Sequence, residues 1–168
     1  MERCEQKVNN YVAYDTSLYA ARDFIHALSD KIAANSDTTG DLPLISARLQ
    51  HITELASMLP QGRVKVEACI STAAVVSGDF DSSGQQSVLA GVDDIQKLWH
   101  QLEEHLTDAK KSLTDAVKQW NTYEAHRDAV DEWLRNEKCV KKEVMVSDVD
   151  EIRPLIKSCQ VQLHVAAQ

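Results

Sequence analysis

The sequence predicts an all-α protein built around an antiparallel three-helix bundle, and three observations favour this fold class. The 168 residues include only 5 Gly and 3 Pro, which is too few for the many tight turns of a β-sandwich or β-barrel. Apolar residues recur at spacings of three and four over long stretches, as is typical of amphipathic helices. Apolar residues make up 43% of the chain and charged residues 26%, a balance that supports a globular core and excludes intrinsic disorder.

The first two predicted helices are separated by a short polar loop. One apolar stripe between Tyr11 and Ile32 predicts a helix over about residues 5–34, and a second stripe that begins at Ile45 predicts a helix over about residues 42–76. The loop at residues 35–41 ends at Asp41, which can cap a helix entered through Pro43.

The third predicted helix, over about residues 85–120, carries the strongest pattern. Residues 77–84 (SGDFDSSG) supply the turn that separates it from the second helix. Short loops force successive helices to run in opposite directions, which predicts an antiparallel bundle. Ten apolar positions then follow an unbroken heptad alternation: Val88, Val92, Ile95, Trp99, Leu102, Leu106, Ala109, Leu113, Ala116 and Trp120.

The residues around and after Trp120 repeat the start of the chain. No Gly or Pro lies between Gly91 and Pro154, so the third helix is expected to continue through residues 119–123 into a second unit, as one helix from about residue 85 to 142. The prediction is one complete unit at residues 1–120, followed at residues 121–168 by the first helix and the start of the second helix of another, in a piece of a longer protein. Six positions recur 109 residues later: Val8, Tyr11, Tyr14, Ala20, Phe24 and Ile25 return as Val117, Trp120, Tyr123, Ala129, Trp133 and Leu134.

This unit resembles the spectrin repeat. The resemblance rests on its length, on an aromatic–aliphatic pair in the first helix, on a Trp midway along the third helix and on the helical linker. The strings Leu98-Trp99-x-x-Leu102 and Trp120-x-x-Tyr123 look most like repeats of the nesprins. Phe24 stands where the family usually has Trp. The resemblance implies that the following residues form the structural core and the linker: Phe24, Ile25, Trp99, Leu102, Trp120, Tyr123, Trp133 and Leu134.

One loop imitates the opening of an EF-hand calcium site. Asp79, Asp81 and Ser83 alternate before Gly84, as the first ligands of such a site do. The twelfth position is Ala90, which lacks the bidentate carboxylate that calcium requires, so an ordinary polar loop is favoured.

A metal site on the third helix and a catalytic site are also disfavoured. His100 and His105 are five residues apart, off the spacing of four that aims two side chains at one metal, so they and the acidic residues between them are interpreted as a solvated face. The chain contains no nucleophile elbow, Walker loop, G-x-G-x-x-G or H-E-x-x-H motif. We expect no catalytic residue, no metal and no cofactor.

The net charge and the spacing of the cysteines indicate which partners and which cell compartment to expect. The formal net charge is -8, and the basic residues are dispersed, which argues against nucleic-acid binding. The four cysteines form no C-x-x-C pair, which favours a reducing, cytosolic compartment. No apolar stretch approaches the roughly 18 residues of a membrane span, so membrane contact by this segment is not expected.

The repeat pattern and its resemblance to the spectrin repeat imply a structural spacer and scaffold that transmits force and sets distance in a large cytoskeletal protein. The nesprin resemblance implies linkage of the nuclear envelope to actin or microtubules, at the cytoplasmic face of the outer nuclear membrane. The alternative is a module that docks a specific partner, such as a motor adaptor, on a helix face. The expected partners are cytoskeletal or scaffold proteins, together with self-association through residues 121–168.

Overall fold

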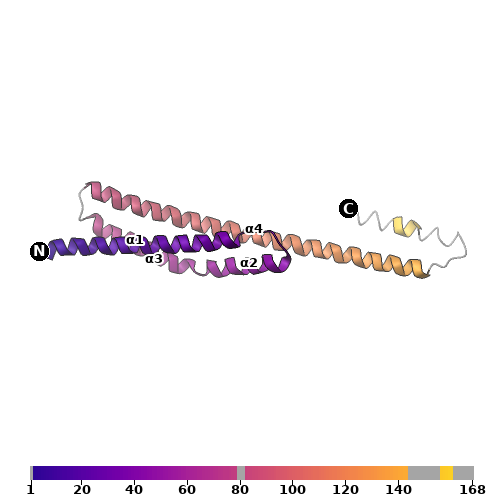
Figure 1. Cartoon of the computed structure of the whole chain (residues 1–168). Helices are drawn as coiled ribbons and strands as arrows, with labels where there is room; N and C mark the ends of the chain where they lie inside the picture. Colours follow the sequence, from indigo (N-terminus) through magenta and orange to yellow (C-terminus); the bar gives the residue numbers. More distant parts are fainter. Residues whose placement is uncertain (1, 79–81, 144–155, 161–168) are drawn as a thin grey trace. The chain divides into compact units, whose positions relative to one another are not determined.

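The structure is a computed structural model that describes residues 2–78, 82–143 and 156–160, and the regular elements of these residues are helical. Four helices are labelled in Figure 1: α1 (Glu2–Asn35), α2 (Leu42–Ala56), α3 (Leu59–Ser77) and α4 (Ser82–Glu143). Residues 156–160 are also helical. The chain divides into two units, unit 1 at Met1–Asn121 and unit 2 at Thr122–Gln168. The predicted all-α, helical-bundle class is confirmed.

Unit 1 is a bundle with three helical layers. Helices α2 and α3 follow one another and run back along α1, while α4 returns in the direction of α1 (Figure 1). Together, α2 and α3 therefore take the place of the single second helix in the predicted antiparallel arrangement.

The prediction of one uninterrupted helix over residues 42–76 was wrong. Helix α2 ends at Ala56 and α3 begins at Leu59. Between them, the backbone N–H groups of Ser57 and Met58 donate to carbonyl oxygens three residues earlier, at 3.1 and 3.0 Å. The cause is Pro60, which has no N–H for the carbonyl of Ala56 and whose ring would clash with that carbonyl in a continuous helix. A proline is tolerated in the first turn of a new helix, so the chain breaks before it.

The start of α2 is fixed by the polar loop before it. The Asp41 side chain accepts a hydrogen bond from the Leu44 N–H at 3.1 Å, which confirms the predicted cap. Arg48 donates to the carbonyl oxygens of Asp37 and Thr39 at 2.8 and 2.6 Å. The Thr39 backbone N–H donates to the Asp37 carboxylate at 2.9 Å, and this hydrogen bond holds the pKa of that carboxyl below its ordinary value.

The core of unit 1 runs along the heptad stripe of α4. All ten stripe positions are buried or packed against the buried cluster. In the described part of the chain no charged side chain is buried, so burial of apolar area is the main stabilising contribution. The other helices contribute buried positions at the spacing of an amphipathic face: Tyr14, Ala21, Ile25, Leu28 and Ile32 in α1; Ile45, Ile52 and Leu55 in α2; and Val66, Cys69, Ala73 and Val76 in α3.

Candidate functional site

Three helices of unit 1 meet at Gly62, in the first turns of α3. A Cβ placed on Gly62 would overlap the Phe24 ring at Cε1 and would lie 2.6 Å from Trp99 Cζ3. Trp99 is buried and Phe24 is partly buried. Only a glycine lets the α3 backbone come this close to both rings. The aromatic side chains of α1 and α4 thus share one packing site.

Three further residues singled out from the sequence lie in unit 1. Ile25 and Leu102 are each 2% exposed and belong to the buried cluster. Trp120 is partly buried and packs against the same cluster. Leu102 and Trp120 extend the core along α4 almost to the boundary of the unit.

The remaining three residues singled out from the sequence lie in unit 2. Trp133 is partly buried, whereas Tyr123 is 57% exposed and Leu134 is 42% exposed. The residues that lie 109 positions before Tyr123 and Leu134 are Tyr14 and Ile25, and both are buried in unit 1. The same sequence pattern therefore has two different environments in the two units.

The boundary between the units lies inside a helix. Helix α4 runs from Ser82 to Glu143, whereas the division between the units falls after Asn121. Residues 119–123 are α-helical, which confirms the prediction that the third helix continues through this stretch.

Polar contacts connect the three layers of unit 1. They were not predicted, because the residues in each pair are 40 to 72 positions apart and no local pattern marks them. The buried thiol of Cys69 lies near one of these contacts, and burial raises its pKa. The contacts are Arg22 to Asp94 at 2.8 Å, Arg63 to Glu103 at 2.9 Å and Ser17 to Thr72 at 2.7 Å.

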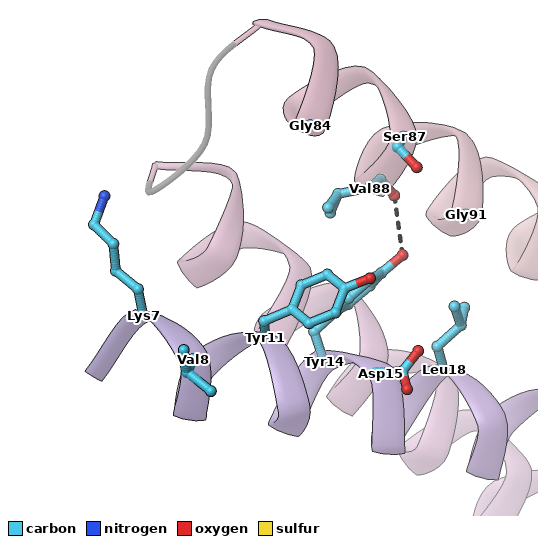
Figure 2. A pocket seen from close by; sticks show the side chains of 10 residues that line it. All are labelled: Lys7, Val8, Tyr11, Tyr14, Asp15, Leu18, Gly84, Ser87, Val88 and Gly91. Atoms are coloured by element: carbon cyan, nitrogen blue, oxygen red, sulfur yellow. Dashed lines mark hydrogen bonds between the residues drawn. The ribbon is translucent and has the colours of Figure 1, made fainter. Parts of the chain in front are cut away.

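An open pocket of about 640 Å³ lies between α1 and the start of α4. Figure 2 shows Tyr14 reaching across it, where its hydroxyl donates to the Val88 carbonyl oxygen at 3.3 Å. A Cβ on Gly91 would lie 2.5 Å from this hydroxyl oxygen, so glycine makes room for the contact. Burial raises the pKa of Tyr14. The lining residues, which define the α1–α4 pocket, are Lys7, Val8, Tyr11, Tyr14, Asp15, Leu18, Gly84, Ser87, Val88 and Gly91.

The α1–α4 pocket was not predicted from the sequence. Two of its residues, Gly84 and Gly91, are one heptad apart and so lie on one face of α4. This pair was the available signal, because a helix face without side chains leaves space beside it.

The described residues that the sequence analysis weighed as metal ligands are not grouped around one point. Asp79 and Asp81 of the calcium-like loop lie outside the described residues. On α4, His100 Nε2 lies 3.3 Å from Glu104 Oε1, and Glu103 is paired with Arg63. Within residues 2–78, 82–143 and 156–160, no three His, Cys, Asp or Glu side chains are grouped as a metal ion would need. None of the helices in this part of the chain is long and apolar enough to span a membrane.

Comparison with known proteins finds distant relatives. The chain is 22% identical over 134 residues to muscle-specific protein 300 kDa of Drosophila melanogaster, covering 80% of this chain and 1% of that protein. It is 23% identical over 122 residues to human nesprin-3, covering 73% of this chain and 12% of that protein. No family model and no solved structure matches. The predicted resemblance to nesprin repeats is confirmed as a distant similarity, which supports a structural role in general.

Proposed function

We propose that this chain is a structural spacer and scaffold segment of a large cytoskeletal linker protein, where it transmits force and sets distance. The observation that carries the proposal is α4, a single helix from Ser82 to Glu143 that forms one layer of unit 1 and continues into unit 2. A helical connection keeps its backbone hydrogen bonds and is stiffer than a polar coil, so tension on one unit reaches the next.

The packing of α4 within unit 1 supports this function. Its buried side chains extend from Val88 to Leu113, and its side chains make ion pairs with both α1 and α3. Pulling α4 out of the bundle would expose these apolar side chains together, which makes resistance to extension cooperative.

We further propose the cellular setting that the nesprin resemblance implies. The parent protein would link the nucleus to actin or microtubules as part of a LINC complex, and this segment would lie at the cytoplasmic face of the outer nuclear membrane. The segment would be non-catalytic, and its partners would be cytoskeletal or scaffold proteins. The similarity to nesprin-3 supports this setting.

A second candidate function is docking of a specific partner on a helix face. The observation that favours it is the exposure of apolar side chains on α1 and α4: Val8, which lines the α1–α4 pocket, and Val12 and Leu89, which do not. A pull-down with the whole chain distinguishes the two functions, because a pure spacer should retain no protein at micromolar concentration.

The spacer function is tested at the boundary between the units by Thr122→Pro. Proline removes the hydrogen bond to the carbonyl four residues earlier and clashes with it, at a cost of about 3 kcal/mol or more. We expect a lower melting temperature and altered dimensions in small-angle X-ray scattering. Thr122→Ala, which keeps the helix, is the control and should match the parent chain. A proline variant with the parent's melting temperature and dimensions would contradict force transmission through a continuous helix.

A further inference from the structure

We propose that α2 is a strap that opens and closes as a unit of its own while α1, α3 and α4 stay bundled. Helix α2 packs on α1 (Figure 1), so its opening uncovers part of the apolar face of α1. This property rests on the proposed spacer function and adds a conformational device to it. The three helices that stay bundled keep the length of the spacer while the strap is open.

The backbone hydrogen bonds of α2 are separate from those of α3. Pro60 has no N–H to donate to the Ala56 carbonyl, so the helical series of hydrogen bonds is interrupted where α2 ends. Helices fold and unfold cooperatively because each turn supports the next, and an interruption limits how far unfolding spreads. A proline is also favourable in the first turn of a helix, so α3 can begin at Leu59 whether or not α2 is folded.

A strap that has left the bundle does not stay helical. Helix α2 has 15 residues, and isolated helices shorter than about 12–15 residues are marginal in water even when they are rich in alanine. It also contains Ile45, Ile52 and Thr53, whose β-branched side chains lose rotamer freedom in a helix. Opening of the strap is therefore local unfolding, in which the amide protons of α2 become free to exchange with solvent.

The polar contacts that join the helices of unit 1 do not involve α2. In the part of the chain that the structure describes, Arg48 binds the loop before α2, and the other side-chain hydrogen bonds and ion pairs of α2 stay within that helix. In contrast, Arg63 joins α3 to Glu103 of α4, and Thr72 joins α3 to Ser17 of α1. Opening of the strap leaves both of these interhelical contacts in place.

The strap and α3 are held by different buried side chains. Helix α2 is held by Ile45, Ile52 and Leu55, and the first two are completely buried. Burial of this apolar area therefore sets the free energy of opening. The buried side chains of α3 extend to Val76, at the end of α3 that lies away from α2. A change at Val76 should weaken the packing of α3 without weakening that of α2.

Hydrogen exchange of the whole 168-residue chain tests the proposal. After correction for intrinsic rates, we expect the amides of residues 46–56 to exchange at least about tenfold faster than those of residues 63–77. Exchange in α2 should also depend less on added urea, because opening of one short helix exposes less surface than global unfolding. Equal rates and equal urea dependence in the two helices would overturn the proposal.

A pair of variants distinguishes local opening from global unfolding. Val76→Ala should speed exchange in α3 by about tenfold or more and leave exchange in α2 unchanged, because the state with an open strap keeps the packing of Val76. Ile52→Val is the matched variant in α2. It should speed exchange in both helices by about twofold to tenfold, because α2 is unfolded in the open and in the globally unfolded state. If Val76→Ala accelerated α2 as much as α3, the two helices would unfold together and the proposal would be wrong.

Pro60→Ala tests the boundary of the strap. Alanine supplies the missing N–H, and the backbones of Ser57 and Met58 are already in the right-handed helical region, so α2 and α3 should join. Exchange in α2 should then slow toward the rate in α3. An α2 that exchanged as fast as in the parent chain would overturn the proposal. These exchange rates do not depend on force transmission through residues 119–123, so the strap and the spacer function can fail independently.

Discussion

Replacing Gly62 by alanine adds one methyl group at the point where three helices meet. The new Cβ would overlap the Phe24 ring and would lie 2.6 Å from Trp99 Cζ3. Both contacts are with ring atoms of side chains that pack in the core, so neither ring can rotate away freely. Overpacking of this kind lowers the free energy of unfolding by about 1–3 kcal/mol. Replacing a glycine inside a helix by alanine raises it by about 0.5–1 kcal/mol when there is room for the methyl group. We therefore expect Gly62→Ala to lower the free energy of unfolding by about 0.5–2 kcal/mol.

The matched control is Gly78→Ala at the end of α3. Among the residues that the structure describes, a Cβ there would meet only the Val75 carbonyl oxygen, at 3.9 Å, and the backbone of Gly78 is in the right-handed helical region. This variant should be neutral or stabilised by up to about 1 kcal/mol. Urea denaturation followed by circular dichroism measures both variants. If Gly62→Ala were as stable as Gly78→Ala, α3 would not approach the two rings as closely as the structure shows.

A double-mutant cycle identifies which ring opposes the methyl group. Phe24→Leu removes the Cε1 atom that lies nearest to the added Cβ. Gly62→Ala should then cost less in the Phe24→Leu background than in the parent chain, with a coupling of about 0.5–3 kcal/mol for directly contacting residues. Strict additivity would mean that Phe24 and Gly62 do not share a packing site.

Trp99→Ala should destabilise unit 1 by about 3–5 kcal/mol in chemical denaturation, whereas a tryptophan that serves only in binding would leave stability unchanged. Asp37→Asn should lower the melting temperature at pH 7 and make little difference at a pH below the lowered pKa that Asp37 has in the folded chain. The pKa of Asp37 is depressed in the folded chain, so its contribution is present above the unfolded pKa of about 4 and is lost as the pH falls through the folded value. The chain should self-associate through Val130 and Leu134, which are exposed on α4 in unit 2; light scattering that stays monomeric across a concentration series, or association that persists after both are changed to Asp, would disprove this.

Features encoded by neighbouring residues could be predicted from the sequence. The extent of α4 follows from a heptad stripe and from the absence of Gly and Pro between Gly91 and Pro154, and the structure gives Ser82–Glu143 against a predicted range of about 85–142. The cap at Asp41 follows from an acidic residue placed just before a proline in the first turn. Both signals depend on residues within one or two helical turns, which is the range over which periodicity and capping act.

Features that depend on distant residues could not be predicted. The stripe of the second helix continues past Pro60 in the sequence, so periodicity suggested one helix where the proline imposes two. The close approach at Gly62 requires knowing that Phe24 and Trp99 face the same point. The α1–α4 pocket depends on how α1 packs against α4, and the glycine pair on α4 marks only one of its two walls.

The heptad stripe alone does not fix the register of the bundle. A slip of α4 by one heptad, about 10 Å, would place apolar residues against apolar residues again. Specific contacts oppose such a slip. The Tyr14 hydroxyl bonds to the Val88 carbonyl and Arg22 pairs with Asp94, with separations of 74 and 72 residues along the chain. Both contacts would break in one step, and Trp99 would leave the space beside Gly62. The periodic apolar stripe thus makes α4 long and well packed, while a few aperiodic residues give it one register, and a spacer needs both properties to hold a constant length.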